Sequence, residues 1–231
     1  MLDTQQHKQA AAEAAVALVG QGMIVGLGTG TTAKLAVDAL GKRVRQGLQI
    51  AGIATSEHTA QQARGLGIPL SSFAEHTEVD LTIDGADEIQ RGTLDLIKGR
   101  GGALLREKVV ASASQRLIII ADDTKLVERL GAHFAVPVEV VQFGWQVAER
   151  KLQKLGARTT LRIATDGKAF VTDGGNFIID SSFGPIKEPA ELGEELKSIV
   201  GVVEHGLFLK MATQAIVGGP EGLTILSAQQ S

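Results

Sequence analysis

The first 130 residues alternate between short apolar runs and segments of helical length, and this alternation restricts the fold more than any other feature. Strands that alternate with helices form mostly parallel sheets with helices on both faces, because right-handed crossovers return each strand to the same direction. The pattern predicts strands at 23–27, 49–54, 79–84 and 116–121, and helices at 4–19, 28–47, 56–67 and 103–114. We therefore expect an α/β fold with a Rossmann-like sheet.

The order of elements changes near residue 131. The pattern there predicts strands at 136–141, 157–164, 169–173 and 176–180, helices at 144–156 and 188–200, and a hairpin turn at 173–176 with the sequence Asp-Gly-Gly-Asn. This order is typical of a small α+β, ferredoxin-like domain. The tail reads as short strands that return to the large sheet. We predict a Rossmann-like catalytic domain at 1–130 and 207–231 and a small domain at 131–206.

Composition excludes several classes of protein. The 231 residues carry a net charge of −3, which argues against wrapping around nucleic acid. The chain has no cysteine, so disulfides, thiolate nucleophiles and cysteine-ligated metal sites are excluded, and a reducing cytoplasm is the expected location. No apolar run approaches membrane-spanning length, and the N-terminal segment lacks the basic region of a signal peptide.

The segment "GLGTGTTA" (26–33) follows the first predicted strand and is a candidate phosphate site. Gly28 and Gly30 let the backbone curl so that its N–H groups point inward, and the next helix begins there. Position 31 is threonine where a dinucleotide fingerprint has its third glycine, and the ending of a Walker loop is missing. A phosphate cradle and a plain strand–helix turn are the two interpretations.

The segment "DGADE" (84–88) places Asp84, Asp87 and Glu88 within five positions after another predicted strand. A single aspartate there would suit a turn or a helix cap. Three carboxylates so close together repel one another, so we expect them to bind something. The sequence leaves open whether that is a divalent metal or the hydroxyl groups of a sugar.

Two further segments carry cations and a candidate base. "KGRGGALLREK" (98–108) begins with Lys98, continues as a glycine loop and enters a helix that carries Glu107. Glu107 is either a catalytic base or an ordinary surface acid favoured by the helix dipole. We expect it to be ionised, because the dipole and Lys98 both favour its charged form. "ADDTK" (121–125) again follows a strand and supplies Lys125, which is either solvated or part of the site.

Together these loops supply an anion cradle, a carboxylate cluster, a cationic glycine loop and one base, which suits a small phosphorylated sugar. Aldose–ketose isomerisation needs only a base and stabilisation of the enediolate. The five histidines have no metal spacing, and no GxSxG elbow is present.

The chain resembles the ribose-5-phosphate isomerase family, type A. The resemblance runs nearly end to end and rests on "GLGTGTTA", "TSE" (55–57), "DGADE", "KGRGGALLREK" and "ADDTK". It implies metal-free interconversion of ribose 5-phosphate and ribulose 5-phosphate through an enediolate, with no cofactor. It also implies a homodimer or homotetramer.

Residue roles follow from this resemblance alone. Glu107 would be the base that moves the proton between C1 and C2, and Lys98 the cation near the developing charge. Asp84 and Asp87 would hold sugar hydroxyls and assist ring opening. The remaining residues expected to bind substrate are Thr29, Gly30, Thr31, Thr32, Gly85, Ala86, Gly99, Arg100, Gly101 and Lys125. Arg100 stands where some relatives have glycine, so it adds a cation to this flank.

Two rival interpretations come from other classes. One is a non-catalytic sensor of phosphosugars on a related fold. Such regulators usually carry a DNA-binding helix-turn-helix, and none precedes residue 20. The other is a nicotinamide-dependent dehydrogenase, which the missing fingerprint features disfavour.

Overall fold

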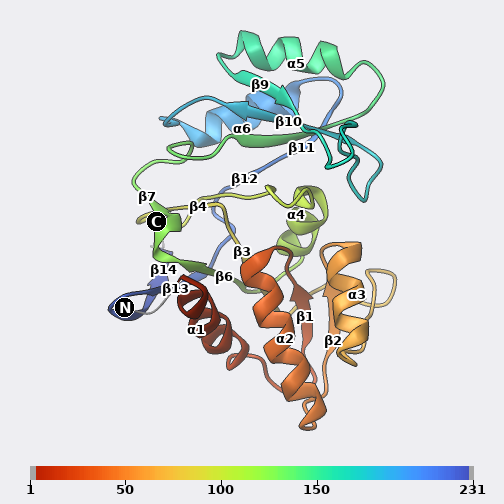
Figure 1. The fold of residues 1–231 in the computed structure, drawn as a ribbon, viewed down its shortest axis with the longest axis vertical. Coiled ribbons are helices and arrows are strands. Elements are labelled where there is room, and N and C mark those ends of the chain that lie inside the picture. Colours follow the sequence, from red (N-terminus) through yellow and green to blue (C-terminus); the bar gives the residue numbers. More distant parts are fainter. Residues whose placement is uncertain (1–3, 229–231) are drawn as a thin grey trace.

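The computed structural model describes residues 4–228, and its central element is a six-stranded sheet (Figure 1). The strand order is β14-β13-β6-β3-β1-β2, and every neighbouring pair is parallel except β13 with β14. The strands are β1 (Ile24–Leu27), β2 (Ala51–Ala54), β3 (Leu81–Gly85), β6 (Leu117–Asp122), β13 (Gln214–Gly219) and β14 (Gly222–Ser227). The predicted mostly parallel sheet is confirmed, and the C-terminal segment returns to it.

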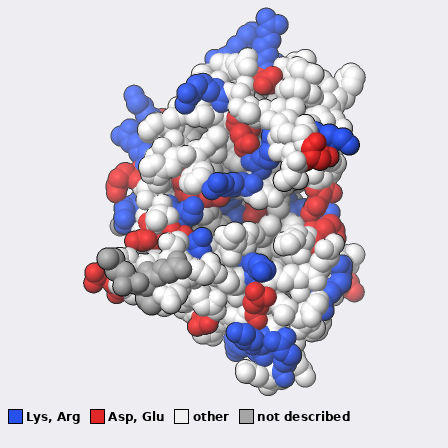
Figure 2. Space-filling view, in the orientation of Figure 1, with Lys and Arg blue, Asp and Glu red and all other residues white. Residues whose placement is uncertain are grey.

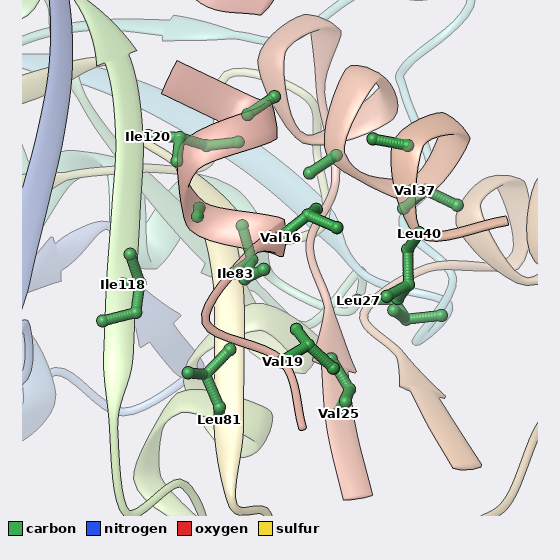
Figure 3. Close-up of a cluster of buried hydrophobic side chains, with 14 of the residues drawn as sticks. Val16, Val19, Val25, Leu27, Val37, Leu40, Leu81, Ile83, Ile118 and Ile120 are labelled. Carbon is green, nitrogen blue, oxygen red and sulfur yellow. The ribbon is translucent and has the colours of Figure 1, made fainter. Parts of the chain in front are cut away.

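Strand β6 shows why these strands are continuous apolar runs. Ile118 and Ile120 belong to one hydrophobic cluster, while Leu117 and Ile119 belong to another on the opposite face. Both faces are therefore buried. Figure 3 shows the first cluster, which lies between the sheet and the helices that cover this face. These helices are α1 (Thr4–Val16), α2 (Thr31–Arg45) and α3 (Glu57–Gly65).

The opposite face is covered by α4 (Leu104–Ser112) together with a small sheet that was not predicted from the sequence. Its order is β12-β5-β4-β7. The strands are β4 (Glu88–Gln90), β5 (Leu96–Ile97), β7 (Leu126–Val127) and β12 (Leu207–Phe208). Strands of two or three residues show no measurable periodicity, so the sequence pattern cannot reveal them. A single 3₁₀ turn, η1 (Asp123–Lys125), joins β6 to β7.

The region after residue 131 forms an antiparallel sheet of order β11-β8-β10-β9, drawn at the top of Figure 1. Apolar side chains of two helices pack against it. The elements are β8 (Val136–Val140), α5 (Trp145–Lys154), β9 (Arg158–Leu161), β10 (Phe177–Ser182), α6 (Pro189–Ser198) and β11 (Val202–His205). The exact division of the chain into two domains stays a prediction.

The prediction of a strand at 169–173 is wrong. Only Ala169 makes an isolated bridge there, with Ile163. The Thr172 hydroxyl donates to Glu139 at 2.8 Å and accepts the N–H groups of Gly174 and Asn176 at 3.2 Å each. These side-chain bonds compete with strand pairing and curl the segment into a turn.

The strand order also locates a crevice. The chain passes from β1 to β2 on one side, while β3 pairs with β1 on the other side. In parallel sheets ligands bind beyond the carboxyl ends of the strands at such a reversal of order. The loops after β1 and β3 are the ones that carry the glycine and acidic motifs.

No helix within residues 4–228 has both the length and the apolar character needed to cross a membrane. Acidic and basic side chains are interspersed over the face shown in Figure 2.

Candidate active site

A cavity of about 500 Å³ lies at this crevice. Its wall is formed by Lys8, Thr29, Gly30, Thr31, Thr32, Gly85, Ala86, Asp87, Lys98, Gly99, Arg100, Gly101, Glu107 and Lys125. The structure thus gathers every residue expected to act in catalysis or to bind substrate except Asp84, and it adds Lys8. Asp84 is 1% exposed and lies behind the wall, bonded to residues that line the cavity.

The loop after β1 is shaped to receive an anion. Gly30 precedes α2 with φ of 110°, no side chain caps the helix, and its first turn carries no acidic residue. The N–H groups of that turn therefore remain available to a ligand. The Thr29 hydroxyl lies within 3.0 Å of those of Thr55, Ser56 and Thr59, so it belongs to a polar network that fixes the loop.

Gly28 explains how this loop approaches Asp84. A Cβ atom at position 28 would lie 2.3 Å from the Asp84 carboxylate, which no side chain could tolerate. With glycine there, Asp84 Oδ1 accepts the N–H of Thr29 at 3.1 Å and that of Gly85 at 2.7 Å. Asp84 therefore joins the loops that follow β1 and β3.

Lys98 lies at the centre of the buried wall and is 2% exposed. Its Nζ is 3.0 Å from Asp84 Oδ2, 3.0 Å from Glu107 Oε1 and 2.6 Å from the carbonyl oxygen of Gly85. All three ammonium hydrogens thus have an acceptor. Burial lowers the pKa of Lys98, but Asp84 and then Glu107 outweigh burial and raise the pKa above its usual range. Lys98 stays charged.

Glu107 is 4% exposed, so the alternative of a surface acid is wrong. Its Oε1 contacts Lys98, whereas its Oε2 is buried and has no hydrogen-bond partner. Burial raises the pKa of Glu107 to about 8, with Lys98 opposing the shift. Lys98 lowers the pKa of Glu107, as expected from the sequence, but desolvation raises it by more, so burial favours the protonated form. A carboxyl group with such a pKa both accepts and returns a proton near neutral pH.

The acidic segment separates into three environments. Asp84 contacts Lys98, while Asp87 Oδ2 accepts the N–H of Arg100 at 3.0 Å and borders the cavity. Glu88 is fully buried elsewhere and accepts backbone N–H groups of the 131–134 loop. No group of three or more histidine, aspartate or glutamate side chains among residues 4–228 could hold a metal ion.

Cations gather on another part of the cavity wall: Lys8, Arg100 and Lys125. Lys8 Nζ lies 3.7 Å from Asp122 at the end of β6. Lys8 was not predicted as a site residue because it belongs to an alanine-rich helix with no motif around it. Only the packing of α1 near β6 brings it to the cavity.

Comparisons with known proteins agree with this geometry. The model of the family described as ribose 5-phosphate isomerase A (phosphoriboisomerase A) matches residues 51–222. A protein of Synechococcus sp. (strain JA-3-3Ab), named ribose-5-phosphate isomerase A, is 55% identical over 227 residues, covering 98% of this chain and 99% of its own. One of Gloeobacter violaceus with the same name is 58% identical over 226 residues, covering 98% of each chain.

Solved structures give the same result. Ribose 5-phosphate isomerase A of Methanocaldococcus jannaschii superposes with a TM-score of 0.93 at 39% identity, covering 97% of this chain and all (100%) of that one. A D-ribose-5-phosphate isomerase in complex with phospho-erythronic acid has a TM-score of 0.95 at 35% identity, covering 98% of this chain and 100% of its own. Because the family model matches most of the chain and the relatives align over nearly all of it, this chain belongs to the ribose 5-phosphate isomerase A family.

Proposed function

We propose that this protein interconverts D-ribose 5-phosphate and D-ribulose 5-phosphate through an enediolate, and that Glu107 carries the proton. One observation supports this assignment. Glu107 lines the cavity, its Oε1 contacts Lys98, and its Oε2 is buried and has no hydrogen-bond partner. A carboxylate in a dry wall accepts a carbon-bound proton only if the charge that develops is stabilised nearby.

In the proposed reaction Oε2 of Glu107 removes the proton from C2 of the open-chain aldose. The electron pair of that C–H bond forms a double bond between C1 and C2, and the carbonyl oxygen O1 becomes negative. Glu107 then returns the proton to C1, while O1 gains a proton and O2 loses one to become the ketone.

Lys98 stabilises the enediolate in this scheme. In the free protein its three hydrogens are directed at Asp84, Glu107 and Gly85. Proton uptake neutralises Glu107 and weakens its contact with Lys98. The Lys98 hydrogen that Glu107 accepted can then be donated to the oxyanion, so the proton transfer itself strengthens the stabilisation of the enediolate.

The remaining wall binds the substrate. The N-terminal turn of α2 and the cations Lys8, Arg100 and Lys125 receive the phosphate. Asp87 borders the cavity and accepts hydrogen bonds from sugar hydroxyls. Asp84 acts from behind the wall, where it holds Lys98 and the loop after β1.

Incubation of chelator-treated protein with ribose 5-phosphate in D₂O tests the proposal. We expect ribulose 5-phosphate to form and to carry deuterium at C1. Addition of EDTA should leave the rate unchanged, because Lys98 and backbone N–H groups carry the charge. Absence of ketose would refute the activity, and loss of rate with EDTA that Mg²⁺ or Mn²⁺ restores would refute the metal-free mechanism.

The family resemblance also suggests a homodimer or homotetramer in the cytoplasm, with a catalytic domain at 1–130 and 207–231. Light scattering on the purified protein tests the first of these proposals.

A further inference from the structure

Glu88 is fully buried, and within residues 4–228 its carboxylate is held by backbone N–H groups and forms no ion pair. Its Oε2 accepts the N–H of Gly131 at 2.6 Å, and its Oε1 accepts those of His133 and Phe134 at 2.6 and 2.8 Å. Hydrogen bonds to an ionised group are stronger than neutral ones, and a buried carboxylate needs them. Glu88 therefore fixes the backbone of the 131–134 loop.

That loop presents one aromatic ring to two cavity cations. Arg100 Cζ lies 5.0 Å from the centroid of the Phe134 ring, and Lys125 Nζ lies 4.8 Å from it. The two cations come from different segments, the glycine loop after β5 and η1 after β6. Cations within about 6 Å of a ring centroid are attracted by the ring's quadrupole. Phe134 is thus a common contact of two residues that line the cavity.

Core packing does not account for Phe134. The ring is half-buried and belongs to none of the hydrophobic clusters formed within residues 4–228. It also borders a neighbouring cavity beside Arg100.

The backbone at Arg100 is already fixed, whereas its side chain is not. The Arg100 N–H binds Asp87, and its carbonyl accepts from Arg162 at 3.1 Å. Long cationic side chains lose rotamer freedom when they bind a ligand, and two like charges repel. A ring that attracts both cations reduces these two costs before the ligand arrives.

We propose that Phe134 and Glu88 are positioning residues for the phosphate end of the cavity: Glu88 fixes the 131–134 backbone, and the Phe134 ring aligns Arg100 and Lys125 to receive the substrate phosphate. This inference rests on the proposed function. It adds a role for the third acid of the "DGADE" segment, which faces away from the cavity.

Substitutions of Phe134 test the ring directly. We expect Phe134→Leu to raise KM for ribose 5-phosphate on the order of tenfold, since two cation–π contacts are lost, while kcat changes less than about twofold. The inhibition constant of inorganic phosphate should rise in parallel. Phe134→Tyr keeps the π face and should restore both constants. Phe177→Leu is the matched control and should change neither constant. Phe177 is also half-buried, but it lies in β10 and packs on a hydrophobic cluster of the antiparallel sheet.

Substitution of Glu88 tests whether its carboxylate fixes the 131–134 backbone. Glu88→Gln keeps the size but turns an amide N–H₂ toward a backbone N–H, so we expect the same rise in KM and in the phosphate inhibition constant. Glu128→Gln is its control, because the Glu128 side chain is 85% exposed and pairs with Arg91 at the surface. If Glu88→Gln does not fold, the Phe134 variants alone decide whether the positioning role holds.

The outcomes separate this inference from the proposed function. An inactive wild-type protein refutes the activity itself. An active wild type whose Phe134→Leu variant keeps its KM and phosphate inhibition constant refutes the positioning role. A loss confined to kcat, or a Phe134→Tyr variant as impaired as Phe134→Leu, also refutes it.

Discussion

The two ends of the cavity use charge in opposite ways. At the end formed by Asp84, Lys98 and Glu107, charged side chains are at most 5% exposed, and Lys98 pairs with both carboxylates before substrate arrives. At the other end Lys8, Arg100 and Lys125 are half-buried or exposed. In the proposed function the buried charges form a preorganised dry wall, and the more exposed cations receive the phosphate. Substitutions in the dry wall should change kcat, and those at the cationic end should change KM.

The largest effect is expected for Glu107→Gln. The amide keeps the size and the contact with Lys98 but cannot accept a proton, so kcat should fall at least about 10²–10⁴-fold. Exchange of the C2 hydrogen with solvent deuterium should fall equally, while the variant still folds and binds phosphate. Near-normal turnover and exchange would remove Glu107 from the mechanism and leave Asp87 as the next candidate.

A smaller but clear effect is expected from pH. The proposed base acts when ionised, and burial raises the pKa of Glu107 to about 8. We expect kcat/KM to reach a plateau above pH 8 and to fall roughly tenfold per unit below it. A profile that stays flat down to pH 6 would contradict this assignment of the base.

The same shift predicts the pH dependence of stability. The pKa of Glu107 is higher in the folded state than its ordinary 4.5. The folded state therefore binds more protons at this group, so the contribution of Glu107 to stability is full below pH 4.5 and is lost as pH rises through about 8. Glu107→Gln should remove this part of the slope, measured by urea unfolding at several pH values.

At the cationic end, Gly30→Val should weaken substrate binding. A side chain at a φ of 110° is strained by about 1–3 kcal/mol, and relief of that strain would turn the N–H groups of the loop away. We expect KM to rise roughly 5- to 150-fold. Binding of unphosphorylated ribose, already weak, should change little.

Gly47 provides a matched control for this loop. It has a φ of 102° beyond the other end of α2 and, like Gly30, has open space where a Cβ atom would lie. Gly47→Val should therefore lower stability without raising KM. Equal weakening of both sugars by Gly30→Val would show that the loop does not bind phosphate.

The smallest effect is expected for Lys8→Met. Lys8 is partly hydrated and already paired with Asp122, so we expect a rise in KM of only about three- to tenfold. The rise should shrink as ionic strength increases, because salt screens exposed charges. Lys42→Met in the last turn of α2 should leave KM unchanged. A dominant effect of Lys8→Met on kcat would break the contrast between the two ends.

The features that the sequence pattern mispredicts have definite physical causes. The 169–173 segment has strand composition, but the Thr172 hydroxyl bonds locally and to Glu139, a residue 33 positions away. The four short strands β4, β5, β7 and β12 have too few residues for any pattern. Glu88 was grouped with Asp84 and Asp87 because it is adjacent in sequence, yet its side chain contacts the 131–134 loop.

The sequence by itself determined the mostly parallel sheet and the loops that line the cavity, since strand and helix periodicity and glycine at a positive φ are local properties of the chain. Only the tertiary structure decided which charged side chains of the cavity are buried and which are exposed. The raised pKa of Glu107 depends on burial by distant segments, and Lys8 and Phe134 reach the site through the packing of α1 and through Glu88. Burial and long-range contact depend on the whole fold, so no local pattern encodes them.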